Sequence, residues 1–95
     1  MVVGILDIKL ALRQCRSLKN KRRILNSLKD RLCNKHNVSV SEVDKQDFCQ
    51  TAHVAVAQVS SDARYVRGSL EKVVKMVRKF RGAQLTDYSI EVFHQ

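Results

Sequence analysis

The stretch from Ser17 to His36 constrains the fold most, because it predicts one long amphipathic helix. Apolar side chains recur on one face at about 3.6 residues per turn. These side chains are Leu18, Ile24, Leu25, Leu28 and Leu32. Ser17 is suited to cap this helix, since its hydroxyl can accept a hydrogen bond from a free N–H group of the first turn. The helix therefore needs an apolar surface to cover.

Lys21 interrupts the apolar face of this helix. A cation in the first turn is disfavoured by the helix dipole by up to about 1 kcal/mol. The stem of a lysine can nevertheless cover apolar surface while its ammonium reaches a polar group. The sequence therefore predicts either an internal acidic partner for Lys21 or a bound anion.

Four other stretches have the alternation or the apolar run expected of β-strands. The predicted strands are Val2–Leu12, Val38–Lys45, Thr51–Ser60 and Leu85–Phe93. The third is apolar on both faces, which is typical of a central strand. Val43 breaks the alternation of the second, which indicates a bulge or the end of the strand.

A second amphipathic helix is predicted over Asp62–Arg81, with a capping cluster before it and Gly82 after it. The resulting order, β-α-β-β-α-β, is that of a ferredoxin-like α+β domain. Such a domain has a four-stranded antiparallel sheet with two helices on one face. The 95 residues contain no linker or repeat, so a single domain over 1–95 is expected. In this fold the candidates for the acidic partner of Lys21 are Asp44, Asp47 and Asp87.

The net charge of +9 favours a polyanionic partner, such as RNA or the surface of a ribonucleoprotein. Two groups of cations on the predicted helices are candidate phosphate contacts. They are Lys19, Lys21, Arg22 and Arg23 on the first helix, and Arg67, Lys75 and Arg78 on the second. The alternative is a basic face that is only solvated.

The open face of the predicted sheet suggests a second kind of contact. Base stacking would need aromatic side chains there, and strands one and three place none on this face. They place small apolar side chains instead, which suit contact between two sheets and predict a homodimer. These residues are Val3, Ile5, Ala55, Ala57 and Val59. Two alternatives remain: a different phase for the third strand, and a protein-docking module whose positive charge is incidental.

No catalytic constellation is recognisable in the sequence, so we expect neither an enzyme nor a small-molecule substrate. An acylphosphatase-like activity is an alternative on this topology, but the Gly-rich anion cradle is missing. The cysteines, Cys15, Cys33 and Cys49, are odd in number and widely spaced, which argues against disulfides and a zinc site. We therefore expect no metal and no cofactor. The chain shows neither a signal peptide nor a membrane-spanning run, so a cytoplasmic location away from membranes is expected.

Two motifs carry a resemblance to a known family. They are Ser17-Leu18-Lys19-Asn20-Lys21-Arg22 and Asn37-Val38-Ser39-Val40-Ser41-Glu42-Val43. With the stretches around 50–62 and 87–92, the chain resembles the small bacterial YlxP-like family over nearly its whole length. The resemblance implies a ferredoxin-like α+β domain and no defined activity. Members are often encoded close to translation and ribosome-maturation genes, which suggests a role near the ribosome.

Overall fold

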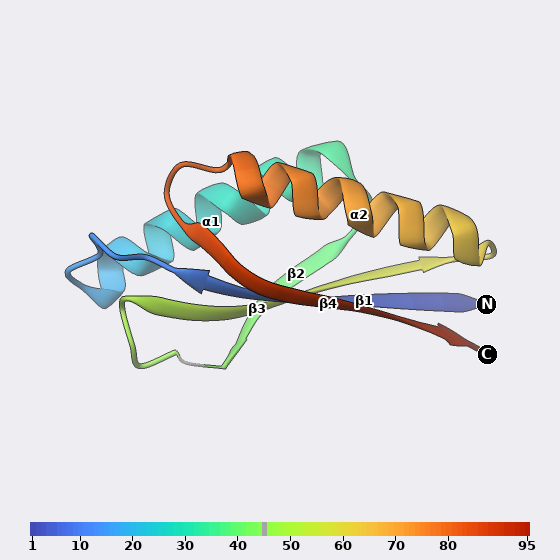
Figure 1. The fold of residues 1–95 in the computed structure, drawn as a ribbon, viewed down its shortest axis with the longest axis horizontal. Helices are drawn as coiled ribbons and strands as arrows, with labels where there is room; N and C mark the ends of the chain where they lie inside the picture. Colours follow the sequence, from blue (N-terminus) through green and yellow to red (C-terminus); the bar gives the residue numbers. More distant parts are fainter. Residues whose placement is uncertain (45) are drawn as a thin grey trace.

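A computed structural model describes residues 1–44 and 46–95. The elements are β1 (Val2–Ala11), α1 (Leu18–Lys35), β2 (Ser39–Asp44), β3 (Thr51–Ser60), α2 (Ala63–Lys79) and β4 (Gln84–His94). The strands form one sheet in the order β2-β3-β1-β4, and all neighbours are antiparallel. Both helices lie on the same side of the sheet (Figure 1). The predicted ferredoxin-like α+β fold is therefore confirmed.

The boundaries of the elements agree closely with those predicted. Lys45, the predicted last residue of the second strand, lies outside the described residues. Ser17 caps α1 by accepting a hydrogen bond from the N–H of Asn20 at 3.1 Å. Asp62 caps α2 in the same way, accepting from the N–H groups of Arg64 and Tyr65. Within the part of the chain that the structure describes, neither helix is long and apolar enough to cross a membrane.

The core lies between the inner face of the sheet and the two helices. Leu6, Ile8 and Leu10 of β1 are buried, and Val54 and Val56 of β3 lie beside them. The predicted apolar stripe of α2 is buried against this face of the sheet. Burial of side chains of this size contributes about 1.5–3 kcal/mol each. The alternation predicted for the first strand and the phase predicted for the third are both confirmed.

A β-bulge at Val43 decides which acidic side chains face the helices. The register of β2 against β3 shifts between Glu42 and Asp44, as the broken alternation of the sequence predicted. Glu42 follows the buried Val40 by two positions and so lies on the inner face. Asp44, after the bulge, pairs with His53 on the outer face. The bulge thus places one carboxylate beneath α1 and the next on the open face.

Two glycines mark close contacts between elements. A Cβ at Gly4 in β1 would collide with the side chain of Val66 and lie 2.8 Å from Leu70 Cδ1. A Cβ at Gly82 would lie 2.9 Å from the ring of Phe80 and 3.0 Å from Ile24 Cγ2. The backbone of Gly82 is outside the left-handed region, and α2 ends at Lys79. Gly82 therefore serves close packing after the helix has ended, and is not itself a left-handed helix cap.

We expect Gly4→Ala to lower the free energy of unfolding by about 1–3 kcal/mol, because the added methyl group must displace α2. Gly68→Ala is the matched control, since a Cβ there meets nothing within 4 Å on the exposed side of α2. It should raise the free energy of unfolding by about 0.5–1 kcal/mol through helix propensity. Urea denaturation measures both. Equal effects of the two substitutions would contradict the close approach at Gly4.

Candidate functional site

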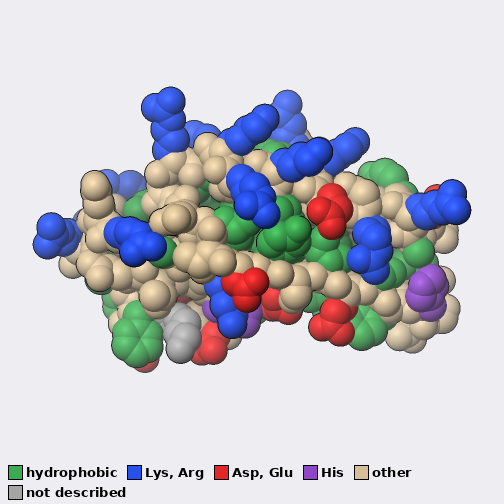
Figure 2. All heavy atoms as spheres, viewed as in Figure 1, with side chains coloured by type: hydrophobic (Ala, Val, Ile, Leu, Met, Phe, Trp, Pro, Cys, Tyr) green, Lys and Arg blue, Asp and Glu red, His purple; other side chains and the backbone are tan. Residues whose placement is uncertain are grey.

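Charge is segregated between the two layers of the molecule. Exposed Lys and Arg side chains cover the helices and the loops at their ends (Figure 2). The sheet side carries Asp7, Asp44, Asp87 and Glu91, against one exposed cation among the described residues, Lys9. A phosphate-bearing ligand is therefore attracted to the helical layer and repelled from most of the open sheet face.

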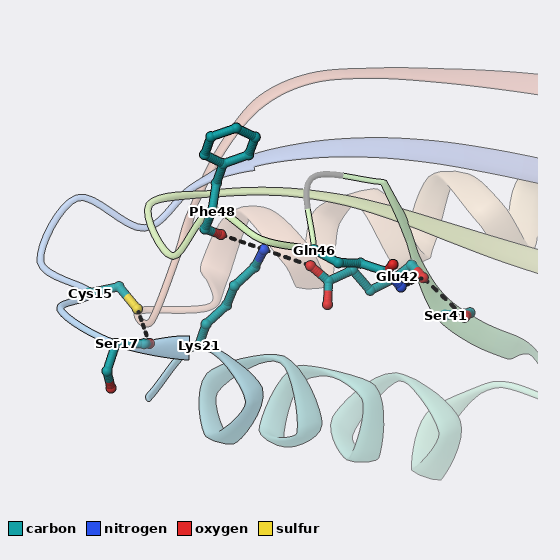
Figure 3. A network of polar contacts seen from close by, with 7 residues as sticks. All are labelled: Cys15, Ser17, Lys21, Ser41, Glu42, Gln46 and Phe48. Carbon is teal, nitrogen blue, oxygen red and sulfur yellow. Dashed lines mark hydrogen bonds and ion pairs between the residues drawn. The ribbon is translucent and has the colours of Figure 1, made fainter. Parts of the chain in front are cut away.

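Lys21 is removed from this basic surface by burial. Its side chain is 2% exposed, and Nζ lies 2.6 Å from Glu42 Oε2. The ammonium also donates a hydrogen bond of 2.6 Å to the carbonyl oxygen of Phe48 (Figure 3). The predicted internal partner is confirmed, and it is Glu42, which was not among the candidates Asp44, Asp47 and Asp87. Lys21 was wrongly placed among the nucleic-acid-binding residues, since its charge is neutralised inside the protein.

The acidic partner of Lys21 was missed because the alternation of β2 was not carried far enough. Val40 is buried on the inner face, and two residues further along the strand Glu42 must face inward too. In Figure 3 the side chain of Lys21 extends from α1 to reach Glu42 on one side and Phe48 on the other. One buried cation thus joins the start of α1, the end of β2 and the loop before β3.

The other predicted cations are exposed, but the structure spreads them over different sides of the helical layer. Arg22 lines a hollow between α1 and β2, together with Lys29 and Glu42. Arg23 lines a groove on the opposite side of α1, next to the end of α2. Lys19 is also exposed. The first predicted group is therefore divided between two hollows.

The second predicted group lies on α2 and forms an exposed stripe. Arg67, Lys75 and Arg78 are all exposed. The guanidinium of Arg78 lies over the ring of Tyr88 in β4, 5.6 Å from its centroid. Because Tyr88 belongs to the edge strand, this side of the stripe faces away from α1. The two predicted groups are thus not one continuous site.

A groove between α1 and the end of α2 does concentrate positive charge. We call it the interhelix groove. Its central part has a volume of about 460 Å³ and is lined by Arg23, Ser27, Arg31, Lys79 and Arg81, with Ile24, Phe80 and Gly82. It continues into a hollow of about 470 Å³ next to the β1–α1 loop, to which Arg13, Gln14 and Asn20 contribute. Among the described residues, no Asp or Glu lines either part.

The walls of the interhelix groove are held by packing contacts. The guanidinium of Arg31 lies 5.2 Å from the centroid of the Phe80 ring, and Phe80 is buried. Arg13 Nε donates a hydrogen bond of 3.0 Å to Gln84 Oε1, which fixes the cation at the far end. Cations held in this way need little further ordering to bind an anion. These two contacts hold the cations of Arg13 and Arg31 in place.

The candidate phosphate contacts predicted from the sequence do not include Arg31, Lys79 or Arg81. The available signal was the spacing of Arg23, Ser27 and Arg31, which recur every four residues on one flank of α1. Helical periodicity shows that these side chains share a flank. It does not show which flank of one helix faces the other helix.

The open sheet face is apolar at one end and polar at the other. Val3 of β1 lies between Val59 of β3 and Phe93 of β4 at the end where both termini lie (Figure 1). Val59 is 61% exposed and Phe93 is 43% exposed. Phe93 was missed in the sequence because only strands one and three were considered for aromatic residues. Ile5, Ala55 and Ala57 continue the apolar surface, and all three are partly buried.

The polar end of the open face contains a histidine–aspartate contact. His53 Nε2 lies 2.9 Å from Asp7 Oδ1. Next to it is a hollow of about 620 Å³, lined by Lys9, His53, Asp44 and Thr86, with Phe48 at its rim. The hydroxyl of Thr86 donates to the carbonyl oxygen of Lys9 at 3.0 Å, so it is engaged in holding the bulge of β4. The contact with Asp7 orients the imidazole of His53.

The chain matches a family model described as "Protein of unknown function (DUF503)" over residues 3–90. It belongs to this family. The DUF503 chain is also 30% identical to "Uncharacterized protein YlxP" of Bacillus subtilis (strain 168), over 97% of its own length and 100% of that protein. The resemblance to the YlxP-like family noted in the sequence is thus confirmed.

Solved structures share the fold of this DUF503 domain at low sequence identity. The de novo designed protein Foldit4 matches with a TM-score of 0.57 and 12% identity, over 100% of this chain and 99% of that one. Acylphosphatase from Bacillus subtilis matches with a TM-score of 0.51 and 11% identity, over 100% and 88%. These likenesses concern the fold, since one fold supports many activities.

The buried pair of this DUF503 domain gives a stability prediction. We expect Lys21→Met to lower the free energy of unfolding by about 2–4 kcal/mol, because it leaves the carboxylate of Glu42 without its cation. Lys19→Met is the control and should change the free energy of unfolding by no more than about 0.5 kcal/mol, since Lys19 is exposed. Urea denaturation of both variants measures the difference. A loss no larger than that of the control would show that the pair does not stabilise the fold.

Proposed function

We propose that this DUF503 chain is a non-enzymatic domain that binds structured RNA or a ribonucleoprotein surface through its helical layer. The observation that supports this proposal is the uneven distribution of charge: nearly all exposed cations lie on the helices and the loops at their ends, while Asp7, Asp44, Asp87 and Glu91 lie on the sheet side. Lys19, Arg22, Arg23, Arg67, Lys75 and Arg78 are proposed contacts, and the cations of the interhelix groove join them. Lys21 is excluded because it is buried.

The physical basis of this binding is the release of counterions. Each phosphate that a Lys or Arg neutralises frees condensed cations, so that affinity falls steeply as salt rises. Contacts of this kind set the position of the protein but carry no sequence information. The acidic open face sets the orientation, because it turns the sheet away from the phosphates. We propose that the domain acts in the cytoplasm, in translation or ribosome maturation, without a metal, cofactor or small-molecule substrate.

Binding to ribosomal RNA and to an unrelated RNA duplex should be measured over a salt series. With six phosphate contacts, the affinity of the parent should fall by about 10³-fold between roughly 50 and 200 mM salt. Charge reversal at Arg67, Lys75 and Arg78 should weaken binding and reduce the salt dependence. Reversal at Lys19, Arg22 and Arg23 should do the same. No binding by the parent at low salt would refute the proposal.

A second candidate function is docking of a protein through the open sheet face, and a homodimer is the specific form that we propose. The observation that favours it is the exposed apolar end formed by Val3, Val59 and Phe93, continued by Ile5, Ala55 and Ala57. Two copies related by a twofold axis could cover this surface. Both helical layers would then face outward and remain accessible to RNA.

Val59→Asp should convert the proposed dimer into a monomer, because it places a charge at the apolar end of the open face. Tyr65→Asp is the matched control: Tyr65 is 58% exposed, close to the 61% of Val59, but it lies on α2. Tyr65→Asp should leave the mass of the particle the same as that of the parent. Sedimentation equilibrium gives the mass of the parent and both variants. A monomeric parent would contradict the homodimer.

A further inference from the structure

The interhelix groove has the charge of a site for one phosphate-bearing strand. One wall comes from α1, and the other comes from the end of α2 and the loop after it. Arg23 and Arg31 on α1 are eight residues apart, which is about 12 Å along the helix axis. Phosphates of one stacked strand are spaced roughly 3.4 Å along its axis, so the groove spans about three of them.

The cations of the groove come from both of its walls. Arg23 and Arg31 come from α1, and Lys79 and Arg81 come from the end of α2 and the loop after it. Arg13 extends the positive charge towards the β1–α1 loop. The described residues contribute no carboxylate to the lining of these two parts. Cations on two walls suit a chain of phosphates better than a single ion, because each successive phosphate meets another cation.

The floor of the groove is formed by packed apolar side chains. Ile24 and Phe80 contribute to it, and Phe80 is buried. Gly82 completes the floor, where a Cβ would collide with the Phe80 ring. Base stacking requires an exposed aromatic face, and the buried ring of Phe80 does not offer one in the groove. The backbone of the strand is therefore the part that the groove can hold.

We infer that the interhelix groove binds consecutive phosphates of a single nucleic acid strand, through Arg23, Arg31, Lys79 and Arg81, with little dependence on base sequence. This inference rests on the proposed function and deepens it. A flexible single strand can turn its phosphates towards the cations of both walls, whereas the two rows of phosphates on the outside of a rigid duplex meet mainly the outward-facing cations. Binding in the groove therefore favours single-stranded segments of an RNA over its paired segments.

The test uses the full chain with a fluorescent oligouridylate and with an RNA duplex of the same length. The groove variant is Arg23→Gln with Lys79→Gln. The control variant is Arg64→Gln with Lys29→Gln, which also removes one Arg and one Lys, one from each helix. All four residues are exposed, and neither residue of the control pair lines the groove. Thermal unfolding of each variant checks that the fold is retained.

Loss of two contacts should weaken oligouridylate binding roughly tenfold at about 0.1 M salt and reduce the slope of log K against log salt by about 1.4. The control pair should weaken it by no more than about threefold, and exchange of oligouridylate for a mixed-sequence strand should have little effect. The duplex should respond less to the groove variant than the single strand does.

The outcomes distinguish a failure of the groove inference from a failure of the proposed function. If the parent binds but the control pair weakens oligouridylate binding as much as the groove pair, the groove has no special role, while RNA binding by the helical layer stands. An equal response of duplex and single strand to the groove variant also overturns the inference. If the parent binds neither RNA at low salt, the proposed function itself is wrong.

Discussion

Helix α2 approaches β1 so closely at Gly4 that a single added methyl group would collide with Val66. This contact, with the packing of α1 beside it, covers one face of the sheet over its central strands and leaves the other face open. The apolar side chains of β1 and β3 that face the helices are buried, while those that face outward are only partly covered. One-sided burial of this kind forces polar and charged side chains to the outer surfaces of the two layers. The outer surfaces of the helices are the basic ones.

Burial also explains the single cation that the fold takes inside. Lys21 is almost completely buried, and an unpaired ammonium there would be costly. Glu42 and the carbonyl oxygen of Phe48 provide the opposite charge and the hydrogen bond that compensate for the lost hydration. The pair withdraws one cation and one carboxylate from the surface together, so the net charge of the exterior is unchanged.

The two layers offer different chemistry to partners. The helical layer has a groove with cations on both walls, which complements a phosphate backbone. The sheet face has an apolar end near the termini and a polar end with the His53–Asp7 contact. Both surfaces can be occupied at once because they lie on opposite sides of the molecule. A domain of this kind could join a nucleic acid to a second protein surface, with the sheet between them acting as a rigid spacer.

Hydrophobic periodicity predicted the order of the elements, and polar capping residues predicted where the two helices begin, because both depend on neighbouring residues in the chain. The fold class followed from that order. The sequence left open whether Val43 marks a bulge or the end of the strand, and it left a second phase for β3 open; the structure shows the bulge and the phase first predicted. The partner of Lys21 could also have been predicted from the sequence, since strict alternation along β2 already turns Glu42 inward. Only the tertiary structure decided which flanks of the helices face each other, and so brought Arg23 and Arg31 together with Lys79 and Arg81. It also gave Gly82 its packing role and placed Phe93 beside Val3, with Val59 on the other side of Val3. These are long-range contacts between elements, and the spacing of residues within one element carries no information about the orientation of its neighbour.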